Sequence, residues 1–304
     1  MASDWTFVSV DVELTNHCMS DCIMCPREAI SRPTGFMTEV VFNKLSEKLI
    51  DEGSLITFSG MGDPLLHPKV FEWICSVRLR GGIIGVVVNP DALHSRNSRK
   101  LVKAGPNSIT LSFPSLREKV FERLCPSISF SDALNRAKEL IGLARGNVGL
   151  RVMGIQTDIN RNESVEYASF WRNLGVPSSV TACHGRGGNV RVAGIYSPES
   201  FEIEYGRCGL FSFHTFVTWE GEVLACCHDL TGSTGIGSLV KLDISLIVER
   251  KQRIIMKGGM PFSVCRQCDE PLRRCVIPQG LPPASRKERN RFFREVSRNT
   301  EYSL

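Results

Sequence analysis

Three cysteines near the start of the chain constrain its fold more than any other feature. Cys18, Cys22 and Cys25 follow an apolar, partly alternating run over residues 7–14, which predicts a buried first strand. A structural zinc site takes four protein ligands, and these three cysteines leave such a site one ligand short. An iron–sulfur cluster held by three thiolates leaves one iron open to another ligand. The spacing therefore predicts an open [4Fe–4S] site after the first strand, with a zinc knuckle as the alternative.

Strand and helix signals then alternate along the chain. Thr38 is predicted to cap a helix that runs to Ile50 and stops at Gly53, and Ser131 is predicted to cap another that runs to Ala144. Further helices are predicted at 68–80, 97–103 and 164–174. Strands are predicted at 55–58, 83–88, 108–113, 149–156 and 178–183. About six strand–helix units fit here, fewer than the eight of a closed barrel, so we expect an α/β fold with a partial (β/α)6 barrel.

The pattern changes near Pro198. Residues 211–219 alternate between apolar and polar side chains, and Glu220 and Gly221 are typical of a turn. Residues 222–225 suit a second strand that runs back along the first, so the segment predicts a hairpin. A helix is predicted at 244–256. This region is too small for an independent core, so we expect a metal to staple it. The predicted division is a barrel domain at 1–195, a hairpin-plus-helix iron–sulfur domain at 196–280, and a basic C-terminal helix or tail at 281–304.

A second set of cysteines falls in this smaller region. The turn at Gly221 reverses the chain direction, so Cys226 is expected to lie beside the start of the partner strand. Four thiols can then converge from the hairpin and a later loop: Cys208, Cys226, Cys265 and Cys268. By residue type alone, the set suits either a structural zinc ion or an iron–sulfur cluster.

Composition narrows the classes of function. No apolar run reaches membrane-spanning length, and the first residues lack the features of a signal peptide. We therefore expect a cytoplasmic protein whose 12 cysteines bind metals rather than form disulfides. The net charge of +5 lies largely in a basic run at 286–294, which we expect to be a solvated face. Neither a nucleic-acid nor a membrane partner is expected.

The N-terminal cysteine spacing, placed after the first strand of a partial barrel, resembles the radical S-adenosylmethionine (SAM) superfamily. The resemblance implies that Cys18, Cys22 and Cys25 hold a [4Fe–4S] cluster whose open iron binds SAM. It also implies that an electron, from a reductant such as flavodoxin or ferredoxin, cleaves SAM to a 5′-deoxyadenosyl radical that abstracts a substrate hydrogen. The later cysteines resemble the twitch domain, a shortened SPASM domain that binds one auxiliary [4Fe–4S] cluster. Only Cys275 follows Cys268, so a second auxiliary cluster is not expected.

Residues 60–64 resemble the GGEP motif of this superfamily, whose backbone meets the SAM amino group. The resemblance implies that Gly60, Met61, Gly62 and Asp63 contact SAM. Asp63 stands where the family commonly has Glu, and an aspartate reaches less far.

Three further residues are predicted to contact SAM. Asn89 and Ser112 lie at the ends of the third and fourth strands, where barrel active sites gather, and are expected near its ribose or methionine part. Met24 stands where the family usually has an aromatic residue. We expect adenine to pack on its thioether instead.

A closed four-thiolate cluster predicts electron transfer, and so a dehydrogenase. We expect a small-molecule substrate such as an amino sugar or aminocyclitol, in natural-product biosynthesis, since the compact chain is similar to 2-deoxy-scyllo-inosamine dehydrogenase. One alternative is a redox-neutral epimerase in which Cys275 or Cys183 donates a hydrogen atom. Peptide maturation is another, although we expect too few residues before the first strand for a peptide-recognition domain. A metal-stapled binding protein without catalytic activity is the last.

Overall fold

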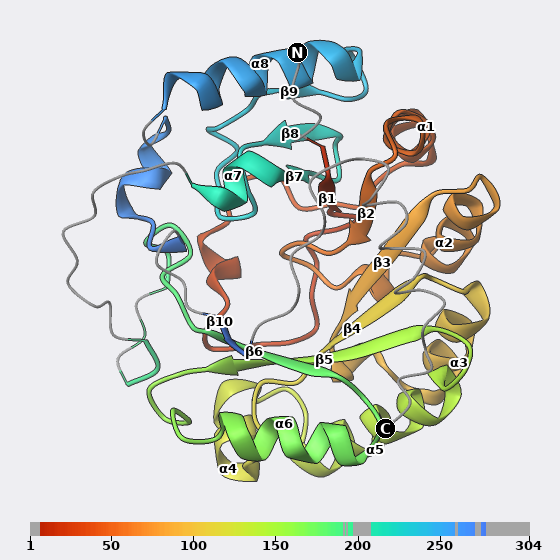
Figure 1. Cartoon of the computed structure of the whole chain (residues 1–304), viewed down its shortest axis with the longest axis vertical. Coiled ribbons are helices and arrows are strands. Elements are labelled where there is room, and N and C mark those ends of the chain that lie inside the picture. The colour runs from red at the N-terminus through yellow and green to blue at the C-terminus, as the bar shows by residue number, and fades with distance from the viewer. Residues whose placement is uncertain are drawn as a thin grey trace.

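The ten described strands form one continuous sheet, with helices packed mainly on its outer side (Figure 1). The computed structural model describes residues 7–190, 192, 194–196, 208–258, 261–270 and 275–277, the last three without side chains. In chain order the strands are β1 (Ser9–Val12), β2 (Leu55–Phe58), β3 (Ile83–Val88), β4 (Ser108–Ser112), β5 (Gly149–Gln156), β6 (Ser178–Ala182), β7 (His214–Val217), β8 (Glu222–Leu224), β9 (Gly237–Ser238) and β10 (Cys275–Ile277).

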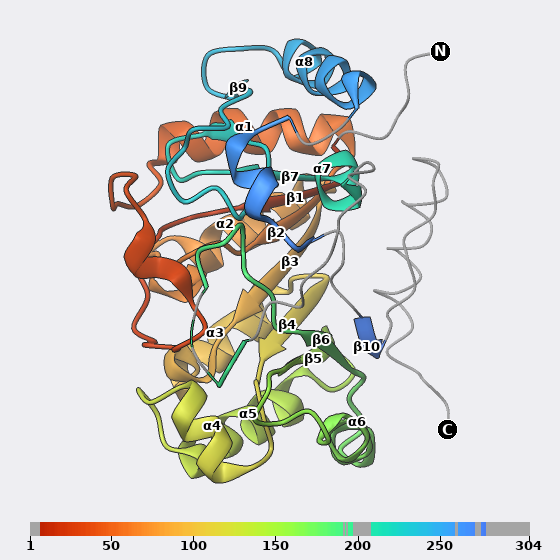
Figure 2. The ribbon, with the colours of Figure 1, turned by 90° about the vertical axis from the view of Figure 1, so that its left-hand side faces the viewer.

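Strands β1 to β6 are parallel neighbours in chain order, as the predicted partial barrel requires. The described helices are α1 (Glu39–Glu52), α2 (Val70–Leu79), α3 (Ser95–Ala104), α4 (Glu118–Leu124), α5 (Phe130–Ala144), α6 (Ser164–Asn173), α7 (Gly209–Phe213) and α8 (Ile244–Lys257). Figures 1 and 2 show α1, α2, α3, α5 and α6 following the outer side of the curved sheet. This confirms the predicted α/β class. No described helix is long and apolar enough to cross a membrane.

The main core lies between the sheet and these helices. Alternate residues of β1 and β2, such as Val12 and Phe58, are fully buried, as a half-covered strand requires. Phe42 of α1 stacks on Trp73 of α2, with ring centroids 4.1 Å apart. The remaining strand positions face the concave side of the sheet. Side chains from several strands can therefore form a functional site there.

Most predicted helix ends are confirmed, and two local predictions are wrong. Thr38 caps α1, and Gly53 ends it with a left-handed φ of 72°. Helix α5, however, is capped by Ser129 rather than Ser131, because the Ser129 hydroxyl accepts the Asp132 amide at 3.1 Å. Residues 211–213 belong to α7 rather than to a strand, since the Ser212 amide donates back to the carbonyl of Cys208 at 3.1 Å.

The C-terminal strands close onto both edges of the six-strand sheet. Strand β7 pairs in parallel with β1, and the β7–β8 hairpin continues outward from it, confirming the predicted turn at Gly221. Strand β10 pairs antiparallel with β6 at the other edge. The C-terminal hairpin is thus hydrogen-bonded directly to the first barrel strand. The predicted division at 195 stays a prediction, and the basic segment 281–304 lies outside the described residues.

Candidate active site

The three N-terminal cysteines lie together in the loop after β1. The Cys25 amide donates to the carbonyl of Cys22 at 2.9 Å, and Cys22 interacts electrostatically with both Cys18 and Cys25. Burial raises the pKa of the Cys18 thiol and of the Cys25 thiol above the ordinary value. A metal centre must displace these protons to bind. Three clustered thiols on one loop fit a cluster with one open iron.

A fourth thiol, which the sequence did not single out, lies against this group. The Sγ atoms of Cys125 and Cys22 are 3.2 Å apart, across 103 residues of chain. Cys125 is buried, and its hydrogen bond with Cys22 raises the pKa of the Cys22 thiol, which burial raises further. Spacing in the sequence carries no signal for such a distant pair.

The predicted SAM loop packs directly against the loop that carries the cysteines. A Cβ atom added at Gly62 would lie 2.3 Å from the carbonyl oxygen of Thr15 and 2.4 Å from that of His17, which leaves no room for any other residue. Gly60 has a φ of 149°, and the buried Met61 donates its amide to the Glu13 carboxylate at 3.2 Å. Close backbone packing therefore links residues 60–62 to the segment before Cys18.

Asp63 and Asn89, which were predicted to act in the same site, are neighbours. The Asp63 side chain is buried, its amide donates to the carbonyl of His17 at 2.9 Å, and Asn89 Nδ2 lies 3.5 Å from its Oδ2. Its other oxygen accepts the Leu65 amide at 2.8 Å. Burial raises the pKa of Asp63 to about 6. Asp63 also interacts electrostatically with Cys18, so these residues share one neighbourhood.

Two other residues, Ser112 and Met24, were predicted to contact SAM. Ser112 is the last residue of β4, at the carboxyl end of the sheet, and Met24 is partly buried against the core beside Cys25. As contacts to SAM, these positions stay predictions.

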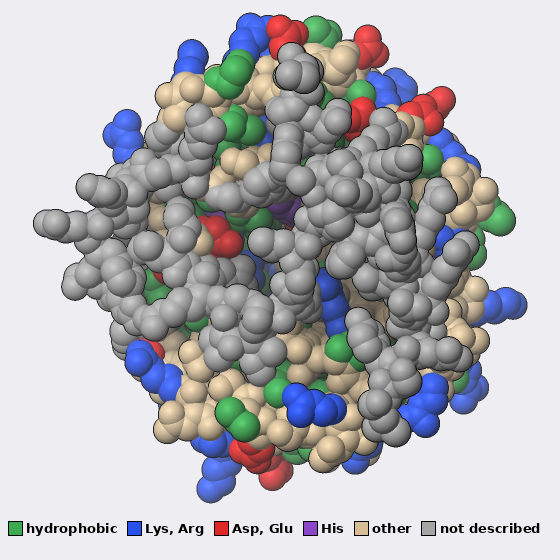
Figure 3. Space-filling model, viewed as in Figure 1, with side chains coloured by type: hydrophobic (Ala, Val, Ile, Leu, Met, Phe, Trp, Pro, Cys, Tyr) green, Lys and Arg blue, Asp and Glu red, His purple; other side chains and the backbone are tan. Residues whose placement is uncertain are grey.

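The concave side of the sheet also carries polar pairs that the sequence did not reveal. His214 Nε2 of β7 lies 3.2 Å from the Asp11 carboxylate of β1, and Arg151 Nε donates to Thr110 Oγ1 at 2.7 Å across β5 and β4. Figure 3 shows histidine and charged side chains in the hollow of this face. Parallel pairing of separate strands creates these contacts, so no local motif predicts them.

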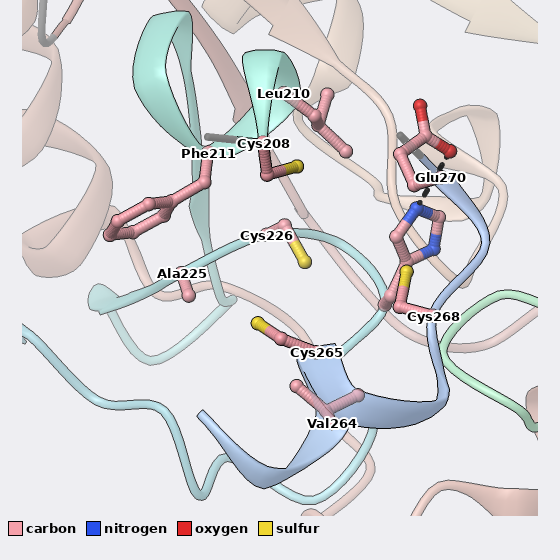
Figure 4. A pocket seen from close by; sticks show the side chains of 10 residues that line it. Cys208, Leu210, Phe211, Ala225, Cys226, Val264, Cys265, Cys268 and Glu270 are labelled. Atoms are coloured by element: carbon pink, nitrogen blue, oxygen red, sulfur yellow. Dashed lines mark hydrogen bonds and ion pairs between the residues drawn. The ribbon is translucent and has the colours of Figure 1, made fainter. Parts of the chain in front are cut away.

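The four C-terminal cysteines line one cavity. Cys208, Cys226, Cys265 and Cys268 line a common pocket, with Phe211 and Val264 among its apolar walls (Figure 4). Burial raises the pKa of Cys226 well above its ordinary value and that of Cys268 to about 11. Four thiols around one cavity fit a closed [4Fe–4S] cluster. Cys227, the neighbour of Cys226, is not among the lining residues.

The two predicted hydrogen donors lie near the β6 edge of the sheet. Cys183 follows β6 directly, is partly buried, and donates its amide to the carbonyl of Gln156 at 2.7 Å. Cys275 begins β10 and stands opposite Thr181 of β6; its side chain lies outside the described part of the structure. The structure thus brings both chain positions to this edge, and their predicted role stays a prediction.

Family profiles match both parts of the chain that carry the cysteine groups. The profile of the radical SAM superfamily matches residues 12–168, which is just over half of the chain. The profile of the SPASM iron–sulfur cluster-binding domain matches residues 208–269, a range that includes all four C-terminal cysteines.

Curated proteins of other organisms are similar to part of this chain. A tungsten-containing aldehyde ferredoxin oxidoreductase cofactor-modifying protein of Pyrococcus furiosus is 24% identical over 56% of this chain and 50% of its own. The chain spans about half the length of the curated relatives it matches.

Solved structures show the same fold. BtrN, in complex with AdoMet and 2-DOIA, has a TM-score of 0.57 at 18% identity, covering 86% of this chain and 93% of BtrN. Streptococcus suis SuiB, bound to its precursor peptide SuiA, has a TM-score of 0.68 at 14% identity, covering 88% of this chain and 70% of SuiB. At such identities the likeness establishes the architecture and leaves the reaction open.

Proposed function

Because this chain belongs to the radical SAM superfamily and carries a C-terminal SPASM domain, we propose that it dehydrogenates a small polar molecule, such as an amino sugar or aminocyclitol. The observation that carries this proposal is the closed set of four cysteine thiols around one cavity. A cluster with a thiolate on every iron has no iron left for substrate, so its simplest role is to accept an electron.

The residues divide between two sites. Cys18, Cys22 and Cys25 would hold the first cluster, and Cys208, Cys226, Cys265 and Cys268 the second. When bound, SAM and the first cluster would supply the abstraction of a hydrogen atom from the substrate, and the second cluster would supply an acceptor for one electron. The protein would hold and orient these groups.

The loop at residues 60–63 would position SAM beside the first site. Gly62 permits close backbone approach, Asp63 supplies a buried carboxylate that interacts with Cys18, and the partly buried Asn89 lies 3.5 Å from that carboxylate. A buried carboxylate can pair with the SAM ammonium group. Polar pairs such as Asp11–His214 on the concave side of the sheet would favour a hydrophilic substrate over an apolar one.

The test begins with anaerobic reconstitution. We expect about eight irons per chain, release of 5′-deoxyadenosine from SAM only with a reductant, and a product two hydrogens lighter than its substrate. A panel of amino sugars and aminocyclitols provides the candidate substrates. Zinc in place of iron, or no 5′-deoxyadenosine, would overturn the enzyme proposal.

Two other reactions have specific support. The partly buried Cys183 after β6 favours an epimerase, which should place deuterium from deuterated water at a C–H bond of an inverted product. The structural likeness to SuiB, solved with a precursor peptide, favours peptide modification. Incubation with peptide substrates, followed by mass spectrometry, separates that reaction from the other two.

A further inference from the structure

Two histidines and a glutamate converge beside the auxiliary-cluster cavity. His184 lies two residues after the end of β6. His228 lies two residues after Cys226, and Glu270 lies two residues after Cys268. One ligand atom of each residue lies within 4.8 Å of those of the other two. The residues belong to three separate loops, so the group exists only in the folded chain.

The distances within this group match those around a metal ion. The Glu270 Oε2 atom lies 3.3 Å from His184 Nδ1 and 3.2 Å from His228 Nε2. Tetrahedral ligands at zinc–nitrogen and zinc–oxygen distances of 2.0–2.1 Å are themselves about 3.3–3.4 Å apart. The His228 Nε2 contact with Glu270 is also within hydrogen-bond range (Figure 4), and both contacts have the length expected between two ligands of one ion.

The three side chains of this group are also largely buried. The side chains of His184 and His228 are 4% and 2% exposed, and that of Glu270 is 12% exposed. The two imidazole rings lie nearly perpendicular, at 76° with centroids 4.8 Å apart, so they approach Glu270 from different directions. Burying a carboxylate against two imidazoles is costly unless a charge or a hydrogen-bond network compensates it.

Neighbouring contacts hold the three loops in place. The Gly185 amide donates to both oxygens of Asp269, at 2.9 and 3.0 Å, which ties the His184 loop to the Glu270 loop. Gly187, with a φ of 69°, packs so closely that an added Cβ atom would lie 2.6 Å from Val264 Cγ2. This loop therefore needs glycine to approach the cysteine-bearing 3₁₀ helix Ser263–Gln267.

We propose that His184, His228 and Glu270 bind one divalent transition-metal ion, Zn²⁺, at a site distinct from both iron–sulfur clusters. Two imidazoles and a carboxylate are a ligand set that zinc accepts, and three protein ligands leave one position for water or a substrate oxygen. Ferrous iron accepts the same two-histidine, one-carboxylate set and is the other ion that the test must identify. Because His228 and Glu270 also line the cluster cavity, that fourth position would lie close to the auxiliary cluster.

The test uses the reconstituted full chain, dialysed anaerobically against zinc. We expect about one zinc per chain beside about eight irons, with zinc X-ray absorption showing only nitrogen or oxygen neighbours at about 2.0–2.1 Å. His184→Gln and Glu270→Gln should each lose the zinc, while His94→Gln, at an exposed position, should keep it. Retained iron and an unchanged circular dichroism spectrum show that a variant is folded.

Each other result has a definite meaning. A ninth iron, seen as high-spin Fe²⁺ by Mössbauer spectroscopy and lost in His184→Gln, would support the same ligand set with iron in it. Zinc with sulfur neighbours at about 2.3 Å, or zinc unaffected by both variants, would overturn the proposal. A chain that binds no zinc and no ninth iron would overturn it as well. Release of 5′-deoxyadenosine in the same samples reports separately on the proposed function.

Discussion

Arg32 donates hydrogen bonds to the Glu13 carboxylate from both of its terminal nitrogens, and both side chains are buried. The distances are 2.8 Å to Oε1 and 3.2 Å to Oε2, with side chains 5% and 0% exposed. The second oxygen also accepts the Met61 amide at 3.2 Å. One buried ion pair therefore connects the end of β1, the segment after the cysteines and the predicted SAM loop.

Removing one partner of this pair should destabilise the protein strongly. Arg32→Ala leaves the Glu13 charge buried without its counter-ion, and we expect a loss of about 3–5 kcal/mol in the free energy of unfolding, measured with denaturant under anaerobic conditions. The matched control is Lys69→Ala, which removes an exposed pair with Glu39 and should leave stability within experimental error. Equal losses in the two variants would contradict the argument.

Gly62→Ala should impair SAM binding without removing either cluster. The new methyl group would collide with the backbone carbonyls of Thr15 and His17, so the loop must shift. We expect the Kd for SAM to rise by at least about tenfold, roughly 1.4 kcal/mol, with iron content unchanged. Gly142→Ala is the control, since no atom lies within 4 Å of the added Cβ in helix α5. SAM affinity that is the same in both variants would show that the loop does not meet the cofactor.

The choice between the adjacent Cys226 and Cys227 can be tested by iron content. Cys226 lines the cavity with the other three thiols, whereas Cys227 is not among its lining residues. Cys226→Ser should reduce the reconstituted chain from about eight irons to about four, and Cys227→Ser should keep about eight. The reverse result would assign the ligand to Cys227.

Lys251 should make the stability of the cluster-free chain depend on pH. This side chain of α8 is fully buried, donates to Thr215 Oγ1 at 2.7 Å, and has a pKa that burial lowers from 10.5 to about 7. Above pH 7 the unfolded chain still holds this proton while the folded chain loses it, so stability rises with pH. Relative to Lys251→Met, we expect the wild type to gain on the order of 1 kcal/mol per pH unit.

Urea unfolding between pH 7 and 8.5, under reducing anaerobic conditions, measures this difference. Cysteine ionisation also changes over this range, but wild type and Lys251→Met carry the same cysteines, so its contribution cancels in the difference between them. Lys257→Met serves as the control, because Lys257 is exposed on the same helix and should add no pH dependence. A difference between wild type and Lys251→Met that stays constant with pH would mean that Lys251 keeps its proton in the folded chain.

Much of the fold could be predicted because its signals are local. A cap such as Thr38, a stop such as Gly53 and the alternation of apolar residues in β2 each act within a few residues, and these predictions are confirmed. The cap of α5 was misplaced by two residues, since Ser129 and Ser131 both suit that role and only the backbone path selects one. Helix α7 replaced the first residues of an expected strand for a similar reason.

The sequence by itself determined the two cysteine groups and the glycine-rich loop, because spacing along the chain limits which thiols and amides can share a centre. Only the tertiary structure decided what lies beside them. The contacts Cys22–Cys125, Asp11–His214 and His184–His228–Glu270 join residues that are distant in the chain. The pairing of β7 with β1 likewise joins distant segments. Such contacts depend on strand order, register and loop packing, which result from burying the whole core and leave no periodic pattern in the sequence.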